Sequence, residues 1–397
     1  MSENITHGIS TVLIVDDNVR NLHLLGSYLK NERLKLEFAI NGISALQWLK
    51  RVSFDLILLD IMMPDIDGYE VCSMIKKDPA FSDIPIVFIT AKTDTASIVE
   101  AFRCGAVDYI TKPFIKDELV ARVNTQIRLK RSNDSQVRYI NEINSKNYQI
   151  TKSIEYAGLI QSAILTRMDA SGVPLPDHFI LFLPKDIVSG DFYWHSKIED
   201  QHVVAVMDCS GHGVPAALMS VLGMTLLNEI VLRRKIIEPA HILEELREGI
   251  IRSLGQTKIN FDVKDGLQGV VVVFSEQEHR LRYSGSYNSL IITDGKKITQ
   301  LKTDRIPIGF FENQNSFTSH SYDLKEGEVV YLVTDGYYDQ FGGRDDKKYK
   351  RRQFLDLLSN IHGFSMGQQC QILHDAHKEW KGSNEQTDDI LVMGVKF

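Results

Sequence analysis

The sequence has few cysteines and no long apolar run. Its 397 residues include four cysteines, at positions 72, 104, 209 and 370, and none forms a CxxC pair. This spacing excludes a disulfide framework and a zinc site built on paired cysteines, and it indicates a reducing compartment. The longest continuous apolar runs, such as Val270–Phe274, are far too short to span a bilayer. The N-terminus has no basic segment followed by an apolar one, so we expect no signal peptide and a soluble, cytoplasmic protein.

An excess of positive charge is also missing. The formal net charge is −7, and no basic patch or helix-turn-helix tail appears. These absences exclude nucleic acid as an expected partner, and the acidic balance argues against docking on an anionic membrane surface. Hydrophobic residues make up 43% and charged residues 24% of the chain, the proportions of a folded globular protein. The length predicts two to three domains.

The first third of the chain alternates short apolar runs with amphipathic stretches. Near-continuous apolar runs are typical of strands buried on both faces of a sheet. The pattern therefore predicts an α/β fold with a doubly wound, five-stranded parallel sheet. The expected strands are 11–15, 36–40, 55–59, 86–90 and 107–111.

Polar residues with complementary chemistry follow these expected strands. Asp16 and Asp17 come after the first run, and Asp60 comes after the third. Strand carboxyl ends open on one crevice of a doubly wound sheet, and carboxylates gathered there favour a hard cation such as Mg²⁺. Asp60 would be the nucleophile that takes a phosphoryl group. Lys112 would neutralise charge on the phosphoryl oxygens, and Thr90 would donate a hydrogen bond to one of them.

The stretches LIVDDN, LILLDIMMPDIDGYE, IVFITA and DYITKPF resemble the response-regulator receiver family over roughly residues 10 to 128. The resemblance implies that a sensor histidine kinase phosphorylates Asp60. It implies Mg²⁺ ligands at Asp16 and Asp17 and a backbone carbonyl ligand at Met62. It also implies that Thr90 and Tyr109 move together as a switch and that the Lys112–Pro113 bond is cis. The alternative is a degenerate receiver that serves only as a docking module.

The segment after the receiver-like region has a helical pattern. No proline or glycine occurs from Ile115 to Tyr156. Steps of three and four residues predict a heptad seam, and we favour a dimeric coiled coil over an amphipathic helix lying on its own domain. The predicted divisions are a receiver domain at 1–128, a coiled-coil linker at 129–165 and a second domain at 166–397. The seam comprises Ile140, Ile143, Asn147, Ile150, Ile154, Ala157, Gln161 and Ile164.

The C-terminal part contains strands that often follow one another directly. This order predicts an α+β fold with antiparallel pairing. The expected helices are 214–233, 239–254 and 353–361. The expected strands are 179–183, 203–207, 270–274, 281–284, 290–293, 329–333 and 390–395.

Aspartates occur at four separate places in this part, most of them beside apolar runs. They are Asp191, Asp208, Asp335 and the pair Asp388–Asp389. Scattered carboxylates without a histidine or cysteine ligand set suit Mg²⁺ or Mn²⁺ rather than zinc. Two such ions could activate a water molecule and bind a phosphate monoester together.

The blocks KDIVSGDFYW, MDCSGHGVPAALMS, TDGYYDQFGG and EQTDDILV resemble type 2C metal-dependent protein phosphatases, specifically the stage II sporulation protein E branch. The resemblance runs from about residue 156 to the C-terminus and implies a β-sandwich flanked by helices. It implies two Mn²⁺ or Mg²⁺ ions held by Asp191, Asp208, the Cys209 carbonyl, Asp335 and Asp388. It also suggests the substrate, a phosphorylated anti-sigma-factor antagonist.

Some positions of this second site keep two interpretations. His212 is either a general acid or a loop histidine that caps the helix beginning near Pro215. Asp389 could replace Asp388 as the ligand, although the resemblance favours Asp388. Gln268 stands where relatives often carry a second acidic residue. The alternative function is a receiver-controlled binding switch, in which an inactive phosphatase fold sequesters a regulator.

Overall fold

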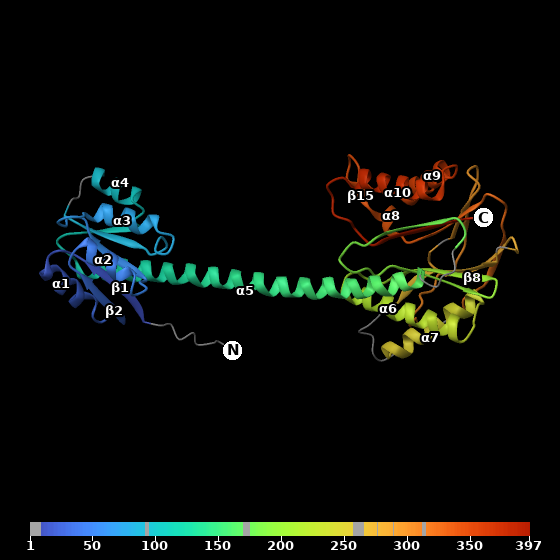
Figure 1. The fold of residues 1–397 in the computed structure, drawn as a ribbon, viewed down its shortest axis with the longest axis horizontal. Helices are drawn as coiled ribbons and strands as arrows, with labels where there is room; N and C mark the ends of the chain where they lie inside the picture. The colour runs from blue at the N-terminus through green and yellow to red at the C-terminus, as the bar shows by residue number, and fades with distance from the viewer. Residues whose placement is uncertain are drawn as a thin grey trace. The chain divides into compact units, whose positions relative to one another are not determined.

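The computed structural model describes residues 9–91, 95–169, 175–256, 266–275, 277–288, 290–311 and 315–397. The chain divides into two compact units, Met1–Asn147 and Tyr148–Phe397, which are described separately below. Figure 1 shows the strands and helices of both units along the chain.

The N-terminal unit is built on one parallel sheet with the strand order β2-β1-β3-β4-β5. This is the predicted doubly wound fold, and the observed strand limits differ from the expected ones by no more than two residues. The strands are β1 (Ser10–Val15), β2 (Leu34–Ala39), β3 (Leu56–Asp60), β4 (Ile86–Thr90) and β5 (Asp108–Thr111). The helices between them are α1 (Val19–Leu29), α2 (Gly42–Leu49), α3 (Gly68–Lys77) and α4 (Thr95–Arg103).

Both faces of this sheet are covered, which explains the near-continuous apolar runs. Val12 and Ile14 pack with α1 and the first turns of α5 (Lys116–Asp169). Leu13 and Val15 point to the opposite face and pack with α2 and α3. Because successive strand residues point to opposite faces, a strand buried on both sides must be apolar throughout.

The long helix α5 (Lys116–Asp169) has 54 residues and continues through the predicted linker. Ile140, Ile143 and Ile150 on its predicted seam are each more than half exposed. Gln161, by contrast, is buried, and Ile164 packs against the core of the C-terminal unit. These last two positions are therefore not available to a second helix. A coiled coil between Ile140 and Ala157 and the linker limits at 129 and 165 stay predictions.

The C-terminal unit is a sandwich of two mainly antiparallel five-stranded sheets with the orders β13-β10-β9-β8-β7 and β12-β11-β14-β17-β6. The first sheet contains β7 (Phe192–Ile198), β8 (Gln201–Cys209), β9 (Leu267–Ser275), β10 (Arg280–Ser286) and β13 (His320–Asp323). The second contains β6 (His178–Leu183), β11 (Leu290–Thr293), β12 (Ile298–Leu301), β14 (Val329–Val333) and β17 (Ile390–Lys396).

Helices cover both outer faces of the sandwich. Val204 and Val206 of β8 face the second sheet, whereas Val203 and Ala205 face the helices α6 (Val214–Leu227) and α7 (Pro239–Leu254). The helices α9 (Arg351–Ile361) and α10 (Met366–Lys381) cover the other sheet. The short elements α8 (Gly336–Asp339), β15 (Phe341–Gly342) and β16 (Lys347–Lys348) connect the second sheet to α9.

Several features of this unit differ from the expectations, and the short elements α8, β12, β13, β15 and β16 were not predicted. The strand β7 and the helix α10 were missed, because β7 is interrupted by polar residues and α10 mixes histidines and glutamines into its apolar face. The expected helix 214–233 ends as a π-helix, η1 (Asn228–Arg233). The segment Val214–Arg233 is also long and apolar enough to cross a membrane, with half of that window buried in the protein. It packs on the first sheet as a core helix.

A pair of buried histidines joins β7 and β8. His195 Nε2 lies 3.1 Å from His202 Nδ1, and the two rings stack with their centroids 5.4 Å apart. Burial, with the nearby His202, lowers the pKa of His195 to about 4. The folded protein therefore keeps His195 neutral at a pH where an unfolded chain would protonate it.

This histidine predicts an acid-sensitive fold. A base with a depressed pKa stabilises the folded state above its unfolded pKa, near 6.5, and that stabilisation is lost as the pH falls toward 4. We expect the fall in melting temperature between pH 7 and pH 4.5 to be smaller in His195→Asn than in the wild type. Calorimetry of the full chain measures this difference. The exposed His279→Asn is the control, and an equal fall in all three proteins would contradict the prediction.

Candidate functional sites in the two units

Three carboxylates meet at the end of the parallel sheet in the N-terminal unit. Asp16 and Asp17 follow β1, and Asp60 is the last residue of β3. Their strands are direct neighbours, with Val15 paired to Leu59. One oxygen from each carboxylate lies within 4.8 Å of the others, the only such group of three or more acidic, histidine or cysteine residues in the described ranges. This all-oxygen donor set fits a magnesium ion.

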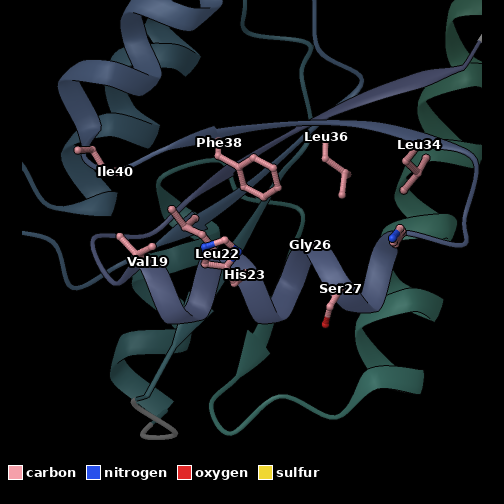
Figure 2. A pocket seen from close by; sticks show the side chains of 10 residues that line it. Val19, Leu22, His23, Gly26, Ser27, Leu34, Leu36, Phe38 and Ile40 are labelled. Atoms are coloured by element: carbon pink, nitrogen blue, oxygen red, sulfur yellow. The ribbon is translucent and has the colours of Figure 1, made fainter.

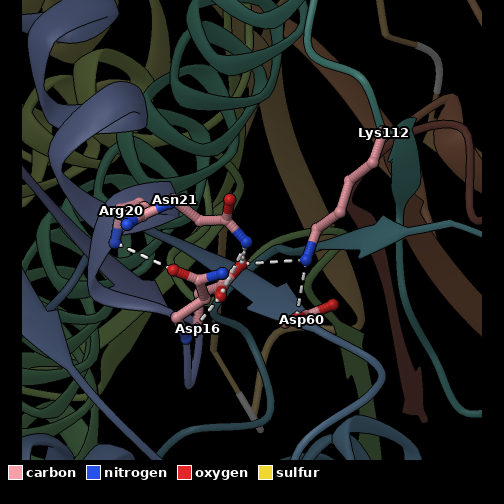
Figure 3. A network of polar contacts seen from close by, with 6 residues as sticks. Asp16, Arg20, Asn21, Asp60 and Lys112 are labelled. Atoms are coloured by element: carbon pink, nitrogen blue, oxygen red, sulfur yellow. Dashed lines mark hydrogen bonds and ion pairs between the residues drawn. The ribbon is translucent and has the colours of Figure 1, made fainter.

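Lys112 reaches into this cluster from the segment after β5 (Figure 3). Its Nζ lies 2.7 Å from Asp60 Oδ2 and 3.0 Å from Asp16 Oδ2. Asn21 Nδ2 donates to both oxygens of Asp16 at 3.0 Å, which fixes that carboxylate. Burial is the main reason that the pKa of Asp60 is raised, and Lys112 opposes the increase. Burial disfavours the charged lysine too, but its hydrogen bonds to Asp60 and Asp16 outweigh this and raise its pKa.

The other predicted receiver residues lie around this cluster. Thr90 is buried at the end of β4, the strand next to β3. Tyr109 lies on β5 beside Phe88 of β4. Its ring packs against Phe102 in an edge-to-face arrangement, with the ring centroids 6.3 Å apart. Met62 is exposed beside a cavity of about 460 Å³ that Asp17 also lines. The Lys112–Pro113 bond is cis, as the resemblance implied.

The aspartates of the C-terminal unit come from both sheets. Asp191 immediately precedes β7, and Asp208 lies near the end of the neighbouring strand β8. Asp335 follows β14 at the start of α8, and the Asp388–Asp389 pair precedes β17, which is the neighbour of β14. The sandwich therefore brings four distant parts of the sequence to one end.

One threonine connects the two sheets at this point. Thr334 Oγ1 donates to Asp191 Oδ2 at 2.7 Å and accepts a hydrogen bond from the backbone N–H of Leu391 at 3.0 Å. Thr334 is buried, so both contacts are shielded from water. The Asp191 carboxylate is thereby held against the second sheet.

The two adjacent aspartates have different environments. Asp389 is 4% exposed, and its carboxylate oxygens accept the backbone N–H groups of Gly190 at 2.7 Å and Lys185 at 2.8 Å. These bonds tie the loop before Asp191 to β17. Asp388 is exposed, and within the described residues its carboxylate accepts one hydrogen bond, from the backbone N–H of Asp389. The geometry thus favours Asp388 for a ligand and gives Asp389 a structural part.

Close packing of backbone is required beside this pair. A Cβ atom added to Gly336 would lie 1.9 Å from the backbone oxygen of Asp389. Only glycine therefore lets α8, which begins just after Asp335, approach the loop that carries Asp388.

The electrostatics of these aspartates indicate a cation site. Burial, together with the charges of Asp335, Asp388 and Asp389, raises the pKa of Asp208 to about 8. Burial and Asp208 raise the pKa of Asp191 well above its usual value. The pKa values of Asp335 and Asp388 are raised too, mainly by loss of hydration and then by neighbouring carboxylates, even though the Asp388 side chain reaches the surface. Within the described ranges no three of these carboxylates have oxygens within 4.8 Å of one another. Their like charges nevertheless favour a bound divalent cation, and the oxygen donors suit Mg²⁺ or Mn²⁺.

Three further residues of this site, which the sequence also indicated, lie near these aspartates in the chain or in the sheet. His212 is exposed on the loop after β8, and its Nδ1 lies 3.2 Å from Asp186 Oδ2. Its interpretation as a helix cap is wrong, because Gly213 is the N-cap of α6 and no side chain bonds there. Gln268 pairs with Asp208 across β8 and β9. The Cys209 carbonyl lies close to Gly190, 3.4 Å from the position of an added Cβ.

Gln161 of α5 is a functional candidate that the sequence analysis placed on the coiled-coil seam. Its Nε2 donates to the Ser189 carbonyl at 2.6 Å and to Ser220 Oγ at 2.8 Å. Its Oε1 accepts the N–H of Ser189 at 3.0 Å. The hydrogen bonds with Ser189 therefore hold the end of α5 against the loop that carries Asp191. The signal available in the sequence was that Gln161, like Asn147, is a polar residue on a mostly apolar seam.

Comparisons with known proteins agree with the two predicted kinds of domain. Residues 12–124 match the response regulator receiver domain, and residues 199–397 match Stage II sporulation protein E (SpoIIE). The structure of the SiaA-PP2C domain of Pseudomonas aeruginosa is similar, with 30% identity and a TM-score of 0.58. The similar region covers 64% of this chain and 98% of the SiaA-PP2C domain chain.

Curated relatives match the N-terminal part. The transcriptional regulatory protein ResD of Bacillus subtilis is 43% identical over 117 residues, 30% of this chain and 48% of that protein. The DNA-binding response regulator MtrA of Mycolicibacterium paratuberculosis is 36% identical over 152 residues, 37% of this chain and 65% of that protein. The chain thus spans about half to two thirds of the length of these two relatives.

The fold and the two groups of aspartates define a receiver domain joined to a PP2C-type phosphatase domain. The chain belongs to the Stage II sporulation protein E family and carries a response regulator receiver domain before the family region.

Proposed function

We propose that this protein is a response regulator whose output is a metal-dependent serine/threonine protein phosphatase, controlled by phosphorylation of Asp60. The observation that carries the proposal is the meeting of Asp191, Asp208, Asp335 and Asp388 at one end of the sandwich in a chain of this family. Burial and neighbouring carboxylates raise the pKa values of all four aspartates, so ionising them together is costly without a cation, which favours a catalytic site over a structural one.

In the receiver, the residues divide the work of phosphoryl transfer. Asp60 attacks the phosphorus atom of a phosphorylated histidine kinase and releases the kinase histidine. A magnesium ion held by Asp16, Asp17, Asp60 and the Met62 carbonyl would offset negative charge on the phosphoryl oxygens. Lys112, already 2.7 Å from Asp60, would contact one phosphoryl oxygen. Thr90 would donate to another, and Tyr109 would follow the movement of Thr90.

In the phosphatase domain, the residues would orient hydrolysis of a phosphomonoester. Two Mn²⁺ or Mg²⁺ ions would make a water molecule a better nucleophile and offset phosphate charge. Asp191, Asp208, Asp335, Asp388 and the Cys209 carbonyl would hold them. Thr334 orients Asp191, and Asp389 fixes the loop before it. His212 would protonate the departing seryl or threonyl oxygen.

The proposed partners follow from the two domains. A sensor histidine kinase would be the phosphate donor, and a phosphorylated anti-sigma-factor antagonist would be the substrate. A homodimer would form through the exposed seam from Ile140 to Ala157, in the cytoplasm. The competing function is a binding switch with an inactive phosphatase fold. Hydrolysis of p-nitrophenyl phosphate by the full chain, with and without a small acyl-phosphate donor, separates the two: the enzyme hydrolyses it and responds to the donor.

The contacts of Gln161 support a route of control through α5. Its side-chain amide bonds both the N–H and the carbonyl of Ser189, two residues before Asp191. Gly158, one turn earlier, lies so close to Ile187 that an added Cβ would be 2.9 Å from its carbonyl oxygen. A rotation or shift of this helix would therefore move the Asp191 loop directly. A tenfold change in activity needs a population shift of only about 1.4 kcal/mol.

Breaking the helix is expected to separate the two activities. Proline at positions 150 and 154 removes backbone hydrogen bonds from α5. We expect Ile150→Pro/Ile154→Pro to keep phosphorylation of Asp60 and basal phosphatase activity but to lose the response of one to the other. Phosphatase rates with and without the acyl-phosphate donor measure this.

The double variant Ile150→Ala/Ile154→Ala is the matched control, because it removes the same side chains and keeps a helical backbone. A wild-type response in the proline variant would show that α5 is only a tether. Loss of the response in both variants would assign the control to the apolar side chains instead.

A further inference from the structure

An apolar groove lies between α1 and β2 in the N-terminal unit. One end of it lies close to the phosphoacceptor cluster, because the N–H of Asp16 donates to the carbonyl of Ala39, the neighbour of Ile40. It has a volume of about 580 Å³. Figure 2 shows Leu36 and Phe38 of β2 facing the helix α1. The strand contributes residues 34, 36 and 38, which lie on one face because side chains alternate, and Ile40 follows the strand. The helix contributes Val19, Leu22, His23, Gly26, Ser27 and Lys30.

Several large apolar side chains that line the groove are exposed to solvent. Val19 is 56% exposed, Phe38 is 41% exposed and Ile40 is 57% exposed. Gly26 stands inside α1, where glycine costs about 1 kcal/mol relative to alanine. A Cβ at this position would lie 3.1 Å from the Phe38 ring, so the glycine keeps this part of the groove open. Large exposed side chains gathered beside an edge strand are typical of an interaction surface.

The rim of the groove is basic. A second hollow continues from Leu34 along the start of α5 and is lined by Arg33 and Arg128, among other residues. Within the described ranges Lys30, Arg33 and Arg128 have no ion pair. The one acidic residue that lines either hollow, Glu32, already accepts a hydrogen bond from Asn124 at 2.8 Å. This positive rim stands out on a chain whose net charge is −7.

The shape of the groove selects the kind of segment that fits it. The strand residues from Leu34 to Ile40 span about 20 Å at 3.3 Å per residue. These side chains lie on the face of the sheet that α1 and α5 cover, because Leu34 and Leu36 pack with α1. Since β2 is the edge strand, this face extends beyond α1 at that edge. A third helix of about 13 residues, at 1.5 Å per residue, would cover this part of the face.

We propose that the groove between α1 and β2 binds an acidic amphipathic helix of a partner protein. Its apolar face would cover Val19, Phe38 and Ile40, and its carboxylates would meet Lys30 and Arg33. None of Asp16, Asp17 and Asp60 lines this surface, and the proposal does not depend on phosphatase activity. It gives the receiver a second protein contact besides its phosphate donor.

The test uses the full chain and a fluorescein-labelled 14-residue peptide with leucines at i, i+3, i+4, i+7 and i+11 and glutamates on the other face. We expect fluorescence anisotropy to show saturable binding that Phe38→Ser and Lys30→Glu each weaken at least tenfold. Leu24→Ser and Lys50→Glu are the matched controls, because both residues are exposed in this unit and neither lines the groove. Both controls should stay within twofold of the wild type. Methyl NMR should place the shifts at Val19 and Ile40.

Three results would overturn the proposal. The first is equal binding of a scrambled peptide or of one with lysine in place of each glutamate. The second is equal loss of binding in the Leu24→Ser control. The third is the absence of peptide binding together with a lower mass of Phe38→Ser than of the wild type in sedimentation. This result would show that a second copy of the chain covers the groove. Labelling of Asp60 by an acyl-phosphate donor verifies that each variant is folded.

Discussion

Replacing Asp208 with asparagine is expected to lower phosphatase turnover by at least about two orders of magnitude, because it removes a charge from the pair of metal sites. Burial, together with the charges of Asp335, Asp388 and Asp389, raises the pKa of Asp208 to about 8, and a hydrogen bond with Asp191 opposes the increase. Asparagine keeps the size of the side chain and removes the negative charge that a divalent cation would balance. The rate of p-nitrophenyl phosphate hydrolysis in Mn²⁺ or Mg²⁺ measures the effect.

The matched control for this variant is Asp356→Asn on α9, an exposed aspartate outside the site. It should keep the wild-type rate. Excess chelator should abolish the activity of the wild type and of the control, and added Mn²⁺ or Mg²⁺ should restore it. Near-wild-type turnover in Asp208→Asn, or full activity in chelator, would contradict the assignment of these aspartates to a metal-dependent catalytic site.

Replacing Asp60 with asparagine is expected to abolish labelling by a small acyl-phosphate donor. The amide is a poor nucleophile, and the other two carboxylates of the cluster are placed to hold the cation. Lys112→Ala should still bind magnesium, because Asp16, Asp17 and Asp60 remain, but it should fail to switch. Labelling is followed by mass spectrometry of the intact protein, and switching by the phosphatase rate.

Asp65→Asn is the control for Asp60→Asn, since Asp65 is exposed on the loop after β3 and has a positive φ of 72° that asparagine also tolerates. It should label as the wild type does. Stoichiometric labelling of the Asp60→Asn protein would refute the assignment of Asp60 as the single phosphorylated aspartate.

The receiver-like half was predictable almost completely from the sequence. Its strands are buried on both faces, so each is a nearly continuous apolar run, and its polar residues come directly after those runs. Parallel strands bring their carboxyl ends to one edge, so local position along the chain already determined that Asp16, Asp17 and Asp60 would meet. The cis bond at Lys112–Pro113 likewise agreed with the resemblance.

The sequence by itself thus determined the fold classes and the family, because these depend on local patterns and motifs, and it predicted the aspartates that the structure brings together in each unit. The resemblance already favoured Asp388 over Asp389 as the ligand, but only the tertiary structure showed that the two differ in burial and in bonds to Gly190 and Lys185. It also reassigned Gln161 from a helix–helix seam to the loop before Asp191. Both outcomes depend on segments 28 to about 200 residues apart, and a helical or strand period carries no information about which distant backbone group a side chain will meet.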